Sequence, residues 1–192
     1  MCNDTKRVYF ATSNIHKFRE VKSILSQYGI DVVMVKGKLL EVQSESLVKI
    51  ATQSIYNALK VGTKTPLILE DSGLFIRSLN GFPGPYSSYV YRTIGLKGIL
   101  KILEGVEDRY AEFKSVIAFA DKFMNIKSFV GVVKGEISQE ERGIYGFGFD
   151  PIFIPYHSSK TFGEMLPQEK NKYSHRAKAL IKFVKWFMRA NM

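Results

Sequence analysis

Two periodicities alternate along the chain, one typical of strands and one typical of helices. Short apolar runs bounded by polar or turn residues predict buried strands over residues 8–11, 31–35 and 67–69. Apolar residues at helical spacing predict helices over residues 15–28 and 47–59, and Gly29 ends the first of them. Longer strands are expected over residues 110–119 and 127–137, and a final amphipathic helix follows Ser174. This order predicts an α/β fold with a mixed sheet.

The length of 192 residues fits one domain that spans residues 1–192 and folds as two lobes about a cleft. Hydrophobic residues make up 45% of the chain and charged residues 24%, which is typical of a globular protein. No apolar run approaches the roughly 18 residues that a membrane helix needs. The apolar stretch near the N-terminus is too short for the core of a signal peptide. We therefore expect a cytoplasmic protein with no membrane partner.

Charge and cysteine content limit the classes of partner and of metal site that the sequence is compatible with. The formal net charge of +10 favours an anionic partner, such as nucleic acid, a membrane surface or a phosphorylated small molecule. A basic solvated surface explains the same charge equally well. The lone Cys2 excludes an internal disulfide, and the three histidines lack the spacing of zinc ligands. Carboxylates are the expected ligands of any metal, which suits a hard ion such as magnesium.

The junction between the first strand and the first helix is a candidate anion site. Residues Thr12 to Lys17 lie at a helix N-terminus, where free backbone N–H groups and the helix dipole attract anions. Lys17, one turn into the helix, could reach the same anion. In the alternative interpretation, Ser13 or Asn14 only caps the helix and Lys17 lies in solvent.

Two adjacent carboxylates, Glu70 and Asp71, follow the predicted strand over residues 67–69. At the carboxyl edge of a buried strand they are costly unless a cation or a proton occupies the site. We expect Ser72-Gly73 to turn the backbone around the ligand. Glu41, in the loop after the second strand, is a candidate third metal ligand. The alternative is a turn with ordinary solvated acids.

The segment from Gly146 to Pro151 carries two glycines on either side of Phe147. This pattern predicts a loop that holds an aromatic ring against a planar group such as a purine base, with Asp150 beside it. Packing of Phe147 and Phe149 in the core is the alternative. A dinucleotide-binding motif is excluded because Pro151 stands in place of its third glycine.

His175 and Arg176 fall in the first turn of the last predicted helix. Cations there oppose the helix dipole by up to about 1 kcal/mol, so local stability does not explain them and a ligand role is favoured. Four further basic residues between positions 178 and 189 recur at helical spacing. We expect this stripe to be a solvated face rather than a nucleic-acid surface.

Taken in order, these motifs resemble the inosine/xanthosine triphosphate pyrophosphatase family. The resemblance runs from Val8 to the last helix, and five motifs carry it: Thr12-Ser13-Asn14…Lys17…Glu20, Glu70-Asp71-Ser72-Gly73-Leu74, Gly81-Phe82-Pro83-Gly84-Pro85-Tyr86-Ser87, Gly146-Phe147-Gly148-Phe149-Asp150-Pro151 and Lys170-Asn171…Ser174-His175-Arg176. It implies an elongated central mixed sheet flanked by helices, with two lobes around an active-site cleft, in a homodimer. It also implies magnesium-dependent hydrolysis of noncanonical purine nucleotides (ITP, dITP, XTP) to the monophosphate and pyrophosphate, which keeps these purines out of DNA and RNA.

The same resemblance assigns roles to individual residues. Asp71 is implied to be the catalytic base and, with Glu41, a magnesium ligand, while Glu70 assists the metal and Ser72 contacts the triphosphate. The implied phosphate-binding residues are Thr12, Ser13, Asn14, Ile15, His16 and Lys17, and the implied base-pocket residues are Phe147, Gly148, Phe149, Asp150, Lys170, His175 and Arg176. One departure is Ser54, which an ungapped comparison places where many members carry a phosphate-binding lysine.

Two alternatives remain open at this point. A related pyrophosphatase with another modified-nucleotide preference shares the chemistry and differs only in its base pocket. A basic nucleic-acid-binding module is a different class, and it leaves Glu41, Glu70 and Asp71 unexplained because acids repel phosphates unless a metal intervenes. We therefore expect a small nucleotide as the partner, with no stable nucleic-acid partner.

Overall fold

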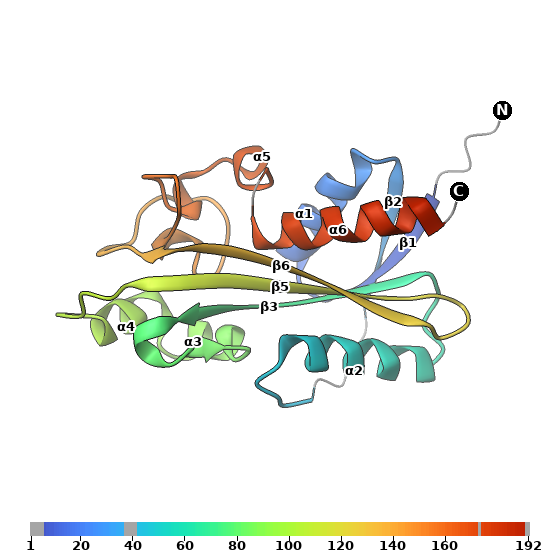
Figure 1. Ribbon diagram of the computed structural model, residues 1–192, viewed down its shortest axis with the longest axis horizontal. Helices are drawn as coiled ribbons and strands as arrows, with labels where there is room; N and C mark the ends of the chain where they lie inside the picture. The colour runs from blue at the N-terminus through green and yellow to red at the C-terminus, as the bar shows by residue number, and fades with distance from the viewer. Residues whose placement is uncertain (1–5, 37–41, 173, 191–192) are drawn as a thin grey trace. The chain divides into compact units, whose positions relative to one another are not determined.

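Seven strands are hydrogen-bonded into one sheet within the residues that the computed structural model describes, 6–36, 42–172 and 174–190 (Figure 1). Six of them follow the order β2 (Ile30–Val35), β1 (Lys6–Ala11), β3 (Leu67–Ile76), β5 (Tyr110–Ala120), β6 (Ile126–Ile137) and β7 (Phe153–Pro155), and β4 (Pro83–Gly84) pairs with β3. β1 runs parallel to β2 and β3, whereas β4 is antiparallel to β3 and β7 is antiparallel to β6. The predicted mixed α/β sheet is confirmed.

Helices connect and follow these strands. They are α1 (Ile15–Ser26), α2 (Leu47–Lys60), α3 (Ser87–Thr93), α4 (Gly95–Ile102), α5 (Pro167–Lys170) and α6 (His175–Ala190), with short 3-10 turns η1 (Arg77–Leu79), η2 (Asp150–Ile152) and η3 (Phe162–Glu164). α1, α2, β1, β2, β5 and β6 begin and end within two residues of the bounds that the hydrophobic pattern predicts. α6 begins directly after Ser174, as expected. No described helix is long and apolar enough to cross a membrane.

β3 is longer than its apolar run predicts. It continues through Glu70, Asp71 and Ser72 to Ile76, so the predicted turn at Ser72-Gly73 is wrong and the two acids lie in the middle of the strand. Gly73 serves a close approach of two backbones and not a turn, since a Cβ atom on it would lie 2.2 Å from the carbonyl oxygen of Gly84. Pro83 and Gly84, within the glycine- and proline-rich segment 81–85, form the short strand β4 for this pairing.

The chain divides into two compact units. Unit 1 comprises Met1–Asp71, Ser115–Gly131 and Arg176–Met192, and unit 2 comprises Ser72–Lys114 and Val132–His175. β3, β5 and β6 each contribute residues to both units. The expected single domain and its cleft stay predictions.

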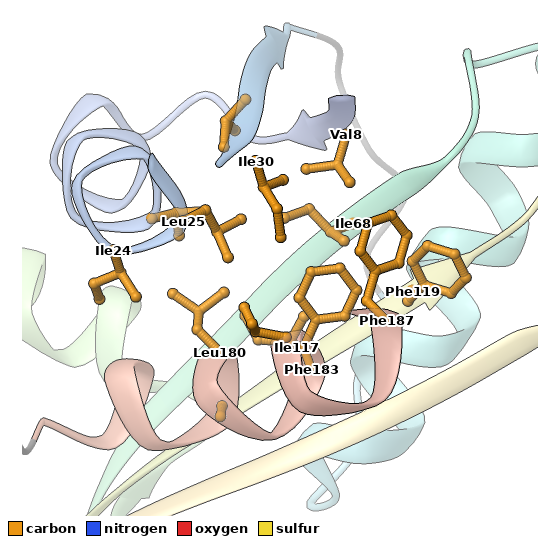
Figure 2. Close-up of a cluster of buried hydrophobic side chains, with 14 of the residues drawn as sticks. Val8, Ile24, Leu25, Ile30, Ile68, Ile117, Phe119, Leu180, Phe183 and Phe187 are labelled. Atoms are coloured by element: carbon orange, nitrogen blue, oxygen red, sulfur yellow. The ribbon is translucent and has the colours of Figure 1, made fainter. Parts of the chain in front are cut away.

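The core of unit 1 lies between its strands and the pair α1 and α6. Ile24 and Leu25 of α1 point toward Leu180 and Phe183 of α6, and strand side chains such as Ile68 complete the cluster (Figure 2). In Figure 1, α1 and α6 lie on one side of the unit 1 strands and α2 lies on the other. Burial of these apolar faces, at about 25 cal/mol per Å², is the main stabilisation of the packing that holds the α1 N-terminus in place.

The core of unit 2 is a separate cluster. The cluster contains Leu74 and Ile76 from β3, Phe113 from β5 and Ile152 from η2, and the aromatic residues Phe153 of β7 and Phe162 of η3 join them. Their rings are in direct contact: the centroids of Phe113 and Phe153 are 4.7 Å apart in an edge-to-face arrangement. This aromatic cluster anchors the segment that carries the candidate base-pocket residues.

Candidate active site

The β1–α1 junction is capped by Asn14. Its Oδ1 accepts hydrogen bonds from the backbone N–H groups of His16 at 2.9 Å and of Lys17 at 3.1 Å, and Thr12 Oγ1 accepts from Asn14 N at 3.1 Å. Asn14 is therefore a helix cap, as the alternative interpretation proposes. The second half of that alternative, Lys17 in solvent, is wrong, because its ammonium contacts Glu70 and its side chain is only 19% exposed.

Glu70 is the centre of a buried charged cluster in unit 1. Its side chain is 0% exposed, and Oε1 accepts a hydrogen bond from Ser115 Oγ at 2.7 Å and lies 3.1 Å from Arg176 Nη2. Its other oxygen, Oε2, is 2.9 Å from Lys17 Nζ. Arg176, with 1% of its side chain exposed, also pairs through Nη1 with Glu20. We call Lys17, Glu20, Glu70, Ser115 and Arg176 the Glu70 cluster.

The charges of the Glu70 cluster balance, with two carboxylates against an ammonium and a guanidinium. Burial alone raises the pKa of the Glu70 carboxyl. The positive charges of Arg176 and Lys17, together with the Ser115 hydroxyl, outweigh this effect and hold the pKa well below its usual range. Glu70 is thus an ionised carboxylate inside the protein.

Asp71 follows Glu70 on β3 and is half-buried. Successive side chains on a strand point to opposite faces of the sheet, so Asp71 does not share the face of Glu70. Glu41, the other expected metal ligand, lies outside the described residues. Within residues 6–36, 42–172 and 174–190, no group of three or more His, Cys, Asp or Glu side chains is close enough to hold a metal ion.

A second buried ion pair lies in unit 2. Lys170 Nζ is 2.7 Å from Asp150 Oδ2, and both side chains are 3% exposed. The same carboxylate oxygen accepts the backbone N–H of Phe147 at 2.7 Å. Lys170 Nζ also lies 5.1 Å from the ring centroid of Phe147 and 5.5 Å from that of Phe162. Charge and aromatic faces therefore converge on the loop that the sequence singled out.

The two phenylalanines of this loop have different environments. Phe149 belongs to the buried core of unit 2 and meets Tyr91 edge-to-face at 5.5 Å. Phe147 is only half-buried. His175, itself buried, stacks on Phe113 with ring centroids 4.6 Å apart and 12° between the planes. Core packing thus explains Phe149, whereas Phe147 is less buried than Phe149.

The structure sorts the predicted site residues into two sets. Lys17, Glu70 and Arg176 meet in unit 1, while Phe147, Asp150 and Lys170 meet in unit 2. Unit 1 also holds Thr12, Ser13, Asn14, Ile15, His16 and Asp71, and unit 2 also holds Ser72, Gly148, Phe149 and His175.

Two contact residues were missed as site residues. Ser115 is the polar residue at the head of a buried apolar stretch of β5, which is a weak signal in the sequence. Phe113, whose ring stacks on His175, has no sequence signal that distinguishes it from other core residues.

Ser54, the position at which the sequence departs from the family pattern, is 1% exposed on the buried face of α2.

The sequence profile of the Ham1 family matches residues 8–186. This chain belongs to the Ham1 family. It is 54% identical to the dITP/XTP pyrophosphatase of Pyrococcus horikoshii, over 94% of this chain and 96% of that protein. It is 51% identical to the dITP/XTP pyrophosphatase of Ignicoccus hospitalis, with the same two coverages. The family expected from the five motifs is confirmed.

Solved structures of Ham1 proteins share the fold. The Staphylococcus aureus Ham1 protein superposes with a TM-score of 0.82 at 29% identity, covering 97% of this chain and 100% of that one. A HAM1 protein from Coxiella burnetii gives a TM-score of 0.81 at 30% identity, with coverages of 96% and 99%. The mixed sheet of this chain is therefore the Ham1 fold.

Proposed function

We propose that this Ham1-family chain is a nucleoside triphosphate pyrophosphatase that hydrolyses dITP, ITP and XTP to the monophosphate and pyrophosphate. The observation that carries the proposal is the near full-length similarity, at 51–54% identity, to proteins named dITP/XTP pyrophosphatase. The two buried ion pairs support it, because each lies among residues that the sequence motifs singled out. The biological role is to keep altered purines out of DNA and RNA.

The triphosphate is assigned to the β1–α1 junction of unit 1. A nucleoside triphosphate carries close to four negative charges, so its hydrolysis requires positive groups that are fixed before the substrate arrives. Lys17 supplies an ammonium that is partly exposed and already oriented by Glu70. The N-terminus of α1 adds the positive end of its dipole. The groups that would bind the triphosphate are therefore positively charged and already in position before it binds.

Asp71 is assigned as the general base. Its half-buried carboxylate, in the middle of β3, can accept the proton of the water that attacks the phosphate chain. Carboxylate oxygens are also the donors that magnesium prefers, so Asp71 fits a metal, with Glu41 as the second ligand. When bound, magnesium would neutralise phosphate charge.

The purine base is assigned to the loop of unit 2. Phe147 offers a half-buried ring, and Lys170 and Asp150 fix the loop beneath it through their ion pair. His175 is assigned to the keto oxygen at position 6 of hypoxanthine and xanthine, to which a ring N–H would donate. Adenine carries an amino group at that position, which leaves such a donor without an acceptor.

The proposed assembly is a homodimer. In unit 2, exposed aromatic side chains gather around β4 and α3, where Tyr86 is 45%, Tyr89 is 62% and Tyr91 is 41% exposed. Aromatic residues are enriched in protein interfaces, which favours this surface for the second copy. A cytoplasmic location and the absence of a stable nucleic-acid partner belong to the same proposal.

A substrate panel tests the proposed function. The purified chain is incubated with dITP, ITP, XTP, dATP, dGTP and dUTP in magnesium, and pyrophosphate is detected enzymatically, with EDTA as a control. We expect release from dITP, ITP and XTP, little from the others, and none in EDTA. Preferred hydrolysis of dUTP would instead assign the related class with another base pocket.

A further inference from the structure

Glu70 is surrounded by donors from three separate parts of unit 1. Ser115 of β5, Arg176 of α6 and Lys17 of α1 all contact its carboxylate within 3.1 Å. The side chain is fully buried, and burying a carboxylate is tolerated only when such partners hold it. Its environment is therefore built to keep it ionised and in one orientation.

Two features argue against Glu70 as a metal ligand. The cluster is already neutral, because Glu20 and Glu70 match Arg176 and Lys17, and a divalent cation would add two uncompensated charges to a buried site. Strand geometry also directs Glu70 to the face of β3 opposite Asp71. A metal ion held by Asp71 would therefore not need Glu70 as a ligand.

We propose that Glu70 is an internal counter-ion that positions Lys17 for the triphosphate, and that Ser115 is the positioning residue that holds Glu70. This inference rests on the proposed function, in which Lys17 binds phosphate. The Ser115 side chain is 0% exposed and donates its hydroxyl to Oε1 at 2.7 Å, so it acts through Glu70 and not on the substrate.

The contacts of Lys17 show how the effect is transmitted. Its Nζ is 2.9 Å from Glu70 Oε2 and 3.5 Å from the backbone oxygen of the same residue. Among the described residues, Lys17 is the ion-pair partner of Oε2, while Ser115 and Arg176 contact Oε1. Rotation of the carboxylate after loss of the Ser115 hydroxyl would therefore move Lys17 directly.

Ser115→Ala tests the proposal. A hydrogen bond to a charged group is worth enough that its loss changes binding about 10-fold. We expect the KM for dITP to rise about 10-fold with kcat within about twofold, because binding is weakened and the base Asp71 is untouched. Titration calorimetry with magnesium pyrophosphate should show the same loss of affinity. Ser115→Cys, which keeps a weak donor of similar size, should recover part of it.

A matched control is Ser138→Ala in unit 2. Ser138 is also a buried serine, and its hydroxyl donates to the Glu140 carbonyl at 2.6 Å. It should lower the Tm about as much as Ser115→Ala while leaving the KM unchanged. Equal KM values in Ser115→Ala and wild type, or a KM rise in Ser138→Ala of the same size, would overturn the positioning role.

A double variant identifies the residue through which Ser115 acts. If Ser115 works through Lys17, Ser115→Ala should add little to the KM of Lys17→Ala, because effects of coupled residues are not additive. Full additivity contradicts the proposal. The magnesium concentration for half-maximal activity should be the same in Ser115→Ala and wild type. A large increase in this concentration would indicate that Glu70 is a metal ligand. Inactive wild-type protein would instead refute the proposed function itself.

Discussion

Lys170 and Asp150 form a buried ion pair at 2.7 Å, and the carboxylate oxygen that they share also accepts the Phe147 N–H at 2.7 Å. One oxygen atom thus fixes both the end of α5 and the loop that carries the candidate base-stacking ring. Gly146 borders this contact in a left-handed conformation with φ of 75°. A Cβ on Gly146 would lie 2.1 Å from Asp150 Oδ2.

Gly146→Ala should therefore displace Asp150 and misplace Phe147. We expect kcat/KM for dITP to fall by roughly 10²-fold, the size of effect that a misplacement of about 1 Å can produce. Steady-state kinetics on dITP measure it. Gly105→Ala is the matched control, because Gly105 also has a positive φ of 71° in unit 2 but nothing within 4 Å of a Cβ. It should cost stability without this loss of activity.

Removing one member of the Asp150–Lys170 pair should destabilise the fold strongly. Asp150→Asn leaves the Lys170 ammonium buried without its carboxylate, a change that typically costs about 3–5 kcal/mol. The double variant Asp150→Asn/Lys170→Met should recover much of that free energy of unfolding but not the activity. Urea denaturation measures the stabilities. Equal stabilities of wild type and Asp150→Asn would mean that the pair is not needed for folding.

Asp71→Asn should separate chemistry from binding. The amide keeps the size of the side chain but removes its charge and its ability to accept a proton, so kcat should fall at least about 10²-fold. The KM for dITP should change less, because Lys17 and the α1 N-terminus still bind the phosphates. A variant that retains wild-type kcat would exclude Asp71 as the base.

His175→Ala should reduce discrimination between ITP and ATP. Its ring stacks on Phe113, and in the proposed base pocket it donates to the keto oxygen of hypoxanthine. A site that relies on such a hydrogen bond can reject an analogue by about 10⁴-fold, whereas shape alone gives about 10²-fold. The ratio of kcat/KM for the two substrates is the measurement. An equal loss for ITP and ATP would assign His175 to structure.

The local elements could be predicted because their signals are local. The capping residue Asn14 and an apolar stripe predict α1, and a short apolar run between polar residues predicts β1. The extension of β3 could not be found in this way. Glu70 and Asp71 look like the start of a turn, since the partners that make Glu70 tolerable inside a strand lie 45 residues away at Ser115 and further still at Arg176.

The candidate site likewise has residues that the sequence motifs identify and contacts that only the folded structure shows. Motif order pointed to Lys17, Asp150 and Lys170, all of which the structure places in buried or partly buried ion pairs. Spacing alone did not reveal that Arg176 pairs with Glu70 and Glu20, because this requires α1, β3 and α6 to be packed. Whether an individual side chain is buried also depends on tertiary packing. Phe149 is buried and Phe147 only half-buried, although both lie in the same short segment.

The bond that is cleaved is the most direct test of the proposed activity. dITP is incubated with the wild-type chain and magnesium, and the phosphorus products are followed by ³¹P NMR while the nucleotide is separated by ion-exchange chromatography. We predict dIMP and pyrophosphate in equal amounts from the first turnover, with no orthophosphate. Release of orthophosphate with dIDP as the nucleotide product would contradict the assignment of this Ham1-family chain as a pyrophosphatase.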